Sequence, residues 1–199
     1  MDGTIFKTHS VIEAAIYSAC HDLSLQPPST KDIRDRLGKL EFSEYYASLF
    51  SNVPPDTLDR LIKLVTKSLE TNLSTHGQLY DGVLNGLNIL AQHHTLAICT
   101  NGKAHQQDKK LIAMGIDKYF TYKAPYDGTD KTARINKLKA LCPLDSIMIG
   151  DMSTDIEAAK QTHILSIGVL WGYGTPKDLS NADYLVERFD QIPTIIDSI

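Results

Sequence analysis

The chain has 199 residues, of which 42 % are hydrophobic, so it can bury the core of one domain together with a modest insertion. Its formal net charge is −4 and its basic residues are scattered, which argues against the basic stripe that binds nucleic acid. No apolar run approaches the ~20 residues that span a bilayer, and no secretory signal is recognisable. We therefore expect neither a nucleic-acid partner nor a membrane.

The three cysteines, Cys20, Cys99 and Cys142, are widely spaced and contain no Cys-x-x-Cys motif. An odd number of cysteines without metal-ligand spacing favours reduced structural thiols, and with them a cytoplasmic location. The sequence leaves open whether the protein is a monomer or a homodimer.

The first third of the chain has the periodicity of helices only. Apolar residues recur at helical spacing from about Ser10, and Ser29 or Thr30 is a candidate N-cap for a short helix over 32–37 that ends at Gly38. A further apolar face falls within residues 42–50, and the longest predicted helix covers residues 56–73. We expect this segment to form an all-α unit.

The pattern changes after Tyr80, where short continuous apolar runs begin to alternate with helices. Such runs are typical of strands buried on both faces of a parallel sheet. The predicted strands are residues 96–99, 119–122, 147–149, 165–170 and 184–186, and the predicted helices are residues 83–91, 109–114, 132–141, 155–161 and 191–196. The sequence thus predicts an α/β fold: a Rossmann-like parallel sheet with helices on both faces, built from residues 1–9 and 79–199, with residues 10–78 inserted as an all-α cap.

Polar residues follow several of these strands at the point where each one ends. Thr100, Asp151 and the turn at residues 172–174 each come after a predicted strand. In an open parallel sheet, ligands bind beyond the carboxyl ends of the strands. We therefore expect a functional site there.

The segment from Gly150 to Asp155 carries two carboxylates, Asp151 and Asp155, across a turn from strand to helix. Their mutual repulsion is expected to raise the pKa of one of them unless a cation lies between them. Mg²⁺ prefers one or two carboxylates with waters and a phosphate, so this segment is a candidate magnesium site. The alternative is that Asp155 is only a carboxylate in the first turn of a helix.

Two further segments suit phosphate chemistry. In Asp2-Gly3-Thr4 a carboxylate beside a tight turn can act as general acid and base, although an Asp-Gly pair is also common in ordinary turns. In Thr100-Asn101-Gly102 a hydroxyl and backbone N–H groups can bind an anion, although Thr100 could instead be a helix N-cap.

Lys131 stands at the start of the helix predicted for residues 132–141, after the loop 126–130. A cation at a helix N-terminus is unfavourable for the helix dipole, which suggests another role for its ammonium group. Lys137 is the competing candidate, but its place in the middle of the helix favours a solvent-facing side chain.

Together these segments resemble the four motifs of the haloacid dehalogenase-like superfamily, in its phosphoglycolate phosphatase-like branch with a helical cap. Residues 167–174 and 182–186 resemble the C-terminal half of that branch, and residues 80–83 the return from cap to core. The resemblance implies a Mg²⁺-dependent phosphatase that hydrolyses a small phosphorylated metabolite through an aspartyl-phosphate.

The resemblance also implies a role for each motif residue. Asp2 would protonate the leaving group, activate water and offer its backbone carbonyl to Mg²⁺, and Thr100 with Asn101 and Gly102 would bind the phosphoryl group. Lys131 would pair with the nucleophile and the phosphoryl group. Asp151 would bind the metal, and Asp155 would bind it or orient Lys131.

The first motif of the family is Asp-x-Asp-Gly-Thr, whose first Asp is the nucleophile. Met1 occupies the x position, so the nucleophile, and the central strand that delivers it between the strands ending at Thr100 and Gly150, would precede residue 1. Three readings stay open: a phosphatase with further residues upstream, an inactive relative that binds Mg²⁺ or phosphate, and a sugar phosphomutase. A dehalogenase needs no metal, so Asp2 and the Asp151–Asp155 pair argue against it.

Overall fold

The computed structural model describes residues 1–40 and 42–199. The chain forms two compact units: the first consists of Met1–Phe6 and Leu79–Ile199, and the second of Lys7–Gln78. The first boundary lies three residues earlier than we expected. The reason is that the backbone N–H of Lys7 donates to the carbonyl of Gln78 at 2.8 Å, which closes the second unit at its own two ends.

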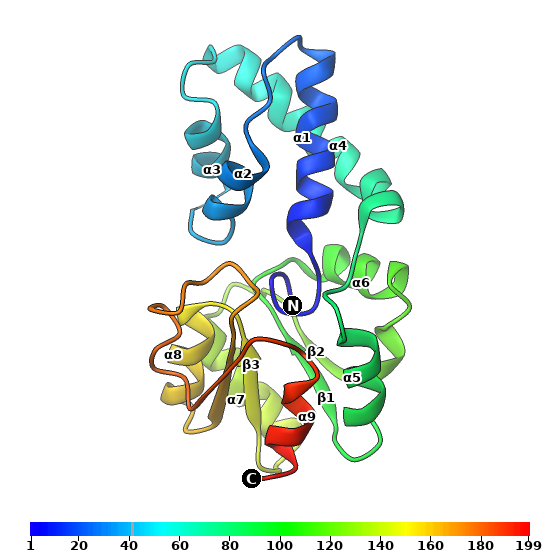
Figure 1. Ribbon diagram of the computed structural model, residues 1–199, viewed down its shortest axis with the longest axis vertical. Coiled ribbons are helices and arrows are strands. Elements are labelled where there is room, and N and C mark those ends of the chain that lie inside the picture. The colour runs from blue at the N-terminus through cyan, green and yellow to red at the C-terminus, as the bar shows by residue number, and fades with distance from the viewer. Residues whose placement is uncertain (41) are drawn as a thin grey trace. The chain divides into compact units, whose positions relative to one another are not determined.

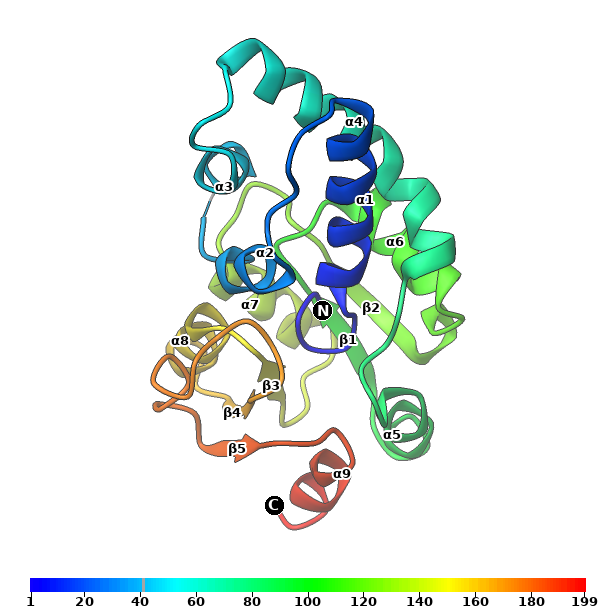
Figure 2. The ribbon, with the colours of Figure 1, turned by 45° about the horizontal axis from the view of Figure 1, so that its top comes forward.

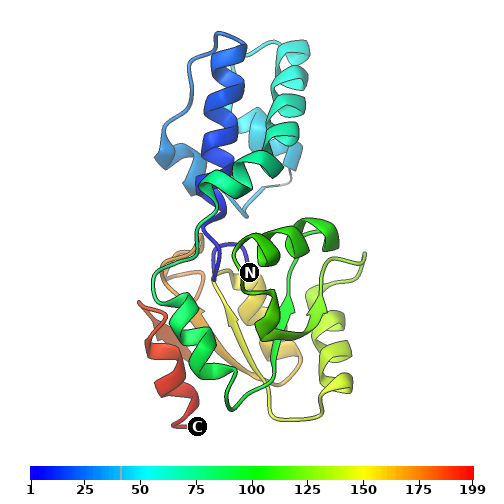
Figure 3. The same ribbon diagram turned by 90° about the vertical axis from the view of Figure 1, so that its right-hand side faces the viewer.

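The second unit is built from helices, as the periodicity predicted. They are α1 (Thr8–Asp22), α2 (Thr30–Arg36), α3 (Phe42–Leu49) and α4 (Pro55–His76). Helix α1 packs along α4, which Figure 3 shows in blue and in cyan to green. Ser29 is the N-cap of α2, because its hydroxyl oxygen accepts from the N–H of Asp32 at 3.1 Å.

The first unit is an α/β fold with parallel strands, as predicted (Figure 1). In chain order its elements are α5 (Val83–Leu90), β1 (Leu96–Cys99), α6 (Ala104–Ala113), the 3-10 turn η1 (Asp117–Tyr119), β2 (Phe120–Ala124), α7 (Lys131–Leu141), β3 (Ile147–Gly150), α8 (Ser153–Gln161), β4 (Leu165–Val169), β5 (Tyr184–Val186) and α9 (Gln191–Ile196). Among the described residues no helix is both long enough and apolar enough to cross a membrane.

Helix α6 begins at Ala104, five residues before the predicted start. Its first turn reads Ala-His-Gln-Gln-Asp, which offers no apolar periodicity, so the pattern became visible only from Lys109 onward. Strand β2 runs on to Ala124 because residues 117–119 are used for the 3-10 turn. The earlier start of α6 matters for the site, because it adds Gln107 to the helix.

The strands form two parallel sheets, ordered β1-β2 and β3-β4-β5 (Figure 2). Within the described part of the chain no ladder pairs β1 with β3. A cavity of about 580 Å³ separates them, lined by residues of both strands and by Met1, Thr4 and Ile5. Its walls include the apolar side chains of Ile98, Met148 and Ile149. This is the position at which we expected a central strand. That a strand from upstream of residue 1 lies there stays a prediction.

Candidate active site

Asp151 joins three segments that are far apart in the sequence. Its Oδ1 accepts from the hydroxyl of Thr4 at 2.9 Å, and its Oδ2 accepts from the backbone N–H of Tyr173 at 3.0 Å. Its backbone carbonyl accepts from the N–H of Gly174 at 3.0 Å. The N-terminal loop, the turn after β3 and the loop after β4 therefore meet at one carboxylate.

Three glycines allow this close approach. A Cβ atom on Gly3, Gly172 or Gly174 would lie 2.1, 2.2 or 2.1 Å from an atom of Asp151, well inside any tolerated contact. Gly3 also has φ +76, a left-handed conformation that favours glycine. The sequence Gly172-Tyr173-Gly174, noted only as a turn, thus forms one wall of the Asp151 environment.

Burial dominates the electrostatics of Asp151, which is 2 % exposed. Desolvation raises the pKa of its carboxyl above the ordinary value, and the negative charge of Asp155 adds to this rise. The hydrogen bonds from Tyr173 and Thr4 oppose this rise. The expected rise is therefore found, but burial rather than repulsion between the two carboxylates is its main cause.

Lys131 and Asp155 form an ion pair whose side chains are 12 % and 7 % exposed. The Lys131 ammonium donates to Oδ1 of Asp155, and Oδ2 of Asp155 accepts from the N–H of Met152 at 3.0 Å. Asp155 thus accepts a hydrogen bond at the start of α8 and also pairs with Lys131, so it is more than a carboxylate in the first turn of a helix. A role for Asp155 toward a metal stays a prediction. Lys137 pairs with Asp127 and is 58 % exposed, which places it on the surface.

Thr100 forms a tight turn rather than a helix cap. Its hydroxyl oxygen accepts from the N–H of Gly102 at 3.2 Å, whereas the N-cap position of α6 is Lys103. The N–H of Gly102, which we expected to face an anion, is therefore used within the turn. The hydroxyl hydrogen of Thr100 can still donate, because its oxygen acts as the acceptor in this bond.

Arg134 holds this turn from behind and was missed in the sequence. Its guanidinium is buried, at 1 % exposure, and donates to the carbonyl of Thr100 and, at 2.5 Å, to Oδ1 of Asn101. Its Nε donates to the carbonyl of Asp130 at 3.3 Å. No local signal marks Arg134, because an arginine in a polar stretch of helix is usually solvent-exposed.

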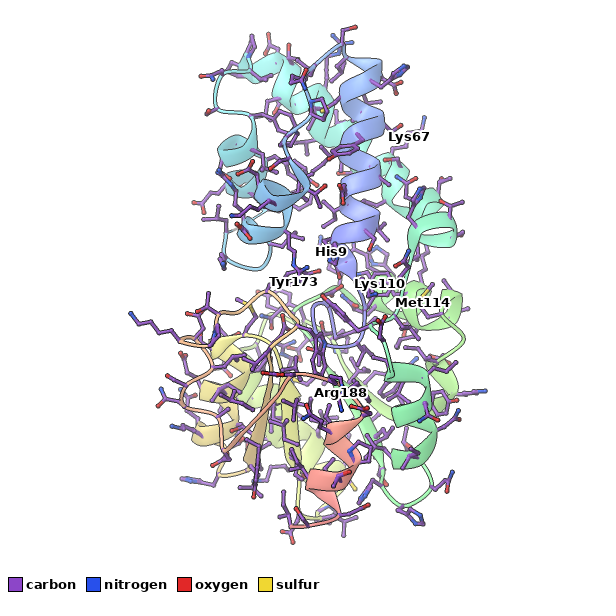
Figure 4. All side chains as sticks on the ribbon, in the orientation of Figure 1. His9, Lys67, Lys110, Met114, Tyr173 and Arg188 are labelled. Carbon is purple, nitrogen blue, oxygen red and sulfur yellow. The ribbon has the colours of Figure 1, made fainter. Side chains whose placement is uncertain are left out.

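Asp2 is held by α6, which the sequence also did not reveal. Its Oδ1 pairs with the ammonium of Lys110 at 2.5 Å, and its Oδ2 accepts from Nε2 of Gln107 at 2.9 Å. Figure 4 labels Lys110 on α6 and Tyr173 on the loop after β4. The N-terminal loop itself is closed by the carbonyl of Met1, which accepts from the N–H groups of residues 4, 5 and 6.

The metal set Asp2, Asp151 and Asp155 stays a prediction. In the described ranges no three His, Cys, Asp or Glu side chains form a group that could hold a metal ion. The ammonium of Lys110 already neutralises the Asp2 carboxylate, so of Asp2 only the backbone carbonyl suits the metal role that the resemblance implies. Asp151 fits Mg²⁺, since a buried carboxylate with one bonded donor on each oxygen keeps lone pairs for a hard cation.

A family profile described as Haloacid dehalogenase-like hydrolase matches residues 1–169. The chain belongs to this family. It is 27 % identical to the probable phosphatase IndB of Dickeya dadantii, over 96 % of this chain and 89 % of that protein. It is 25 % identical to a phosphoglycolate phosphatase of Agrobacterium fabrum, over 87 % of this chain and 79 % of that protein.

Solved structures share the fold of this chain. The crystal structure of a predicted phosphoglycolate phosphatase from Haemophilus somnus has a TM-score of 0.84 at 23 % identity, covering 98 % of this chain and 95 % of that one. As a haloacid dehalogenase-like hydrolase, the chain is an enzyme by family, and its named relatives are phosphatases. Thr100 and Asp151 each follow a strand directly, at the end where open parallel sheets generally bind ligands, and Lys131 reaches Asp155 from the start of α7.

Proposed function

We propose that this haloacid dehalogenase-like hydrolase is a Mg²⁺-dependent phosphatase acting on a small phosphomonoester of the phosphoglycolate or sugar phosphate type. The observation that carries the proposal is the buried Asp151, which binds both the N-terminal loop and the loop after β4. A carboxylate that burial makes costly to ionise is best explained by a cation that binds it. The relatives named phosphatase and phosphoglycolate phosphatase support the substrate class.

Each residue then has a defined task. Asp151 would hold Mg²⁺ with the backbone carbonyl of Asp2, and Asp155 would act mainly through Lys131. The bound Mg²⁺ supplies charge neutralisation for the phosphoryl oxygens. Lys131 adds a second positive charge there, and the hydroxyl of Thr100 donates to a phosphoryl oxygen.

Asp2 would move the proton in both halves of the reaction. In the first half an oxygen of the nucleophilic carboxylate, which is a separate group from Asp2 and Asp151, forms a bond to phosphorus. The bond from phosphorus to the leaving oxygen of the substrate breaks, and Asp2 gives this leaving oxygen its proton. In the second half water attacks the phosphorus of the aspartyl-phosphate, Asp2 takes a proton from the water, and phosphate and the free carboxylate are released.

The nucleophilic carboxylate belongs, by family pattern, one residue before Met1. The cavity between β1 and β3 supports this placement, because an extended segment in that slot would reach the N-terminal loop through Met1, Thr4 and Ile5, which line it. Such a segment would also pair with β1 on one side and β3 on the other, which no ladder joins within the residues that the structure describes. We propose that the reaction requires this segment.

The second unit, residues 7–78, is proposed to act as the cap that selects substrates. Its support is a compact all-helical fold inserted between Phe6 and Leu79 of the α/β unit. Lids of this kind exclude water and complete a site. A cytoplasmic location is proposed on the three free thiols of Cys20, Cys99 and Cys142.

The proposal is tested by phosphate release from phosphoglycolate, pyrophosphate and a set of sugar phosphates, with Mg²⁺ and with EDTA. We expect Mg²⁺-dependent turnover of at least one substrate by a chain extended upstream through Asp-Met-Asp, and far lower turnover by residues 1–199. Asp151→Asn in the extended chain should abolish the Mg²⁺-dependent turnover, and Asp145→Asn, at an exposed position, should leave it unchanged.

Two results would count against the proposal. Turnover that is insensitive to EDTA would remove the metal from the mechanism. Equal turnover by the two chain lengths, abolished in both by Asp2→Asn, would show that the nucleophile lies within residues 1–199. If both chains bind Mg²⁺ but neither shows turnover, the result would instead favour the reading that this protein is an inactive member of the family.

A further inference from the structure

The carboxylate of Asp2 has both of its oxygens bound by one helix. Lys110 approaches Oδ1 at 2.5 Å and Gln107 donates to Oδ2 at 2.9 Å, and both donors come from α6. The pair is shielded, with the Lys110 and Asp2 side chains 18 % and 28 % exposed. A partly buried pair is screened less by salt than a surface pair, so it constrains its members more strongly.

The two donors are themselves held in place. Positions 107 and 110 are three apart on a helix, so their side chains lie on the same face. Gln107 is 4 % exposed and packs against the backbone of Gly102, where a Cβ would lie 1.6 Å from its Nε2. The Lys110 ammonium lies 5.4 Å from the centre of the Phe6 ring. Both donors are therefore held in place by contacts other than their contact with Asp2.

Gln107 also carries an energetic cost that fold stability does not explain. Its Oε1 is buried and has no hydrogen-bond partner among the described residues. An unsatisfied buried acceptor destabilises the folded state, which a leucine at this position would avoid. The presence of a glutamine at position 107 is explained by its Nε2, which donates a hydrogen bond to Asp2.

We propose that Lys110 and Gln107 are positioning residues that set the orientation of the Asp2 carboxylate. The proposal rests on the acid/base role of Asp2 in the proposed function. A general acid must lie within hydrogen-bond reach of the atom that it protonates, and a small misplacement is costly. With one donor fixed on each oxygen, the plane of the carboxylate is set, and lone pairs remain to carry the transferred proton.

The kinetic test compares Lys110→Met, Lys110→Arg and Gln107→Leu with Lys109→Met in the chain extended upstream. Lys109 is the neighbouring exposed lysine on α6, so its substitution removes the same charge. The substrates are p-nitrophenyl phosphate and phenyl phosphate with Mg²⁺. Nitrophenolate leaves readily without a proton, whereas phenolate is a poorer leaving group and depends more on the acid.

We expect Lys110→Met and Gln107→Leu to lower kcat/KM for phenyl phosphate about 10- to 100-fold, a part of the usual contribution of a general acid. The loss with p-nitrophenyl phosphate should be several-fold smaller. Lys110→Arg should recover most of the activity, and Lys109→Met should lie within about twofold of the parent for both substrates. Equal losses for the two substrates, or the same loss in Lys109→Met, would overturn the proposal.

A second measurement does not depend on activity. Urea unfolding of residues 1–199 and of its Asp2→Asn, Lys110→Met and doubly substituted variants forms a double-mutant cycle. We expect non-additivity of about 3- to 10-fold in the unfolding equilibrium constant. Additive effects would overturn the proposal. If the extended chain shows no turnover, the proposed function fails on that result, and the cycle alone decides whether α6 holds Asp2.

Discussion

The hydroxyl of Thr4 donates a 2.9 Å hydrogen bond to Asp151 across 147 residues of sequence. Both side chains are almost fully buried, at 4 % and 2 % exposure. The indole N–H of Trp171 donates to the carbonyl of Thr4 at 2.9 Å, so the N-terminal loop is bound on both sides. This link connects the loop that carries Asp2 to the proposed metal ligand.

Thr4→Val keeps the shape of the side chain and removes this hydrogen bond. We expect a loss of about 1–3 kcal/mol in unfolding free energy, because a buried carboxylate oxygen loses its donor. The melting temperature should fall by about 2–4 °C for each kcal/mol in a protein of this size. Mg²⁺ affinity, measured by calorimetry, should fall about tenfold, as is typical when a partner that orients a ligand is removed. Thr194→Val, at an exposed position of α9, should change neither quantity.

Asp151→Asn should stabilise the metal-free protein, and more so as the pH rises. Because burial raises the pKa of Asp151 in the folded state, the folded state binds more protons than the unfolded state between the ordinary pKa and the raised one. The unfolding free energy of the parent therefore falls as the pH rises through this window, and the asparagine variant escapes that loss. An amide can still accept from Tyr173 and donate to Thr4, whose hydroxyl can rotate.

Urea unfolding in EDTA between pH 3 and pH 8 measures the effect. The advantage of Asp151→Asn should be absent at the acid end and largest at the alkaline end, and added Mg²⁺ should stabilise the parent only. An advantage that is the same at every pH would show that ionisation of Asp151 is not its source.

Gly172→Ala should disrupt the site through a single methyl group. The new Cβ would meet Cβ of Asp151 at 2.2 Å, so either the loop or the carboxylate must move. We expect a loss of about 1–3 kcal/mol, typical of overpacking, together with loss of Mg²⁺ binding. Gly128→Ala is the control for the clash, since no atom lies within 4 Å of the place that a Cβ would take there: it should lose stability through its backbone φ of +90 but keep Mg²⁺ binding. A functional Gly172→Ala variant would contradict the close approach.

Arg134→Met should cost about 2–4 kcal/mol, because it leaves the carbonyl of Thr100 and the amide oxygen of Asn101 without their buried donor. Thermal unfolding measures the loss. Arg134→Lys should recover only part of it, since an ammonium cannot reproduce the geometry of the guanidinium. Arg188→Met, where the side chain is 70 % exposed, should lie within about 0.5 kcal/mol of the parent.

Lys131→Met and Lys137→Met separate the two lysines that the sequence offered for the phosphoryl site. Lys131 is buried against Asp155, whereas Lys137 is an exposed partner of Asp127. In the extended chain we expect Lys131→Met to lower kcat at least about 100-fold through lost charge stabilisation, with little change for Lys137→Met. Comparable losses in the two variants would assign no special role to Lys131.

The sequence determined the fold class and predicted the place of the candidate site. Alternating apolar runs and helices predicted the parallel α/β unit, because strands buried on both faces must be apolar throughout. Thr100 and Asp151 stood out because each follows such a run directly. These signals are local, since they depend on residues within a few positions of one another.

Only the tertiary structure decided how the site is held together. Gln107 and Lys110 meet Asp2 across 105 and 108 residues, and Arg134 reaches the turn at Thr100 across 34. Nothing in the local pattern marks these three, because a polar residue in a polar stretch of helix has the same sequence signature whether it faces solvent or a buried carboxylate. The burial that raises the pKa of Asp151 likewise comes from packing of distant loops around it. Residue types are local information, whereas desolvation and pairing exist only once the chain has folded.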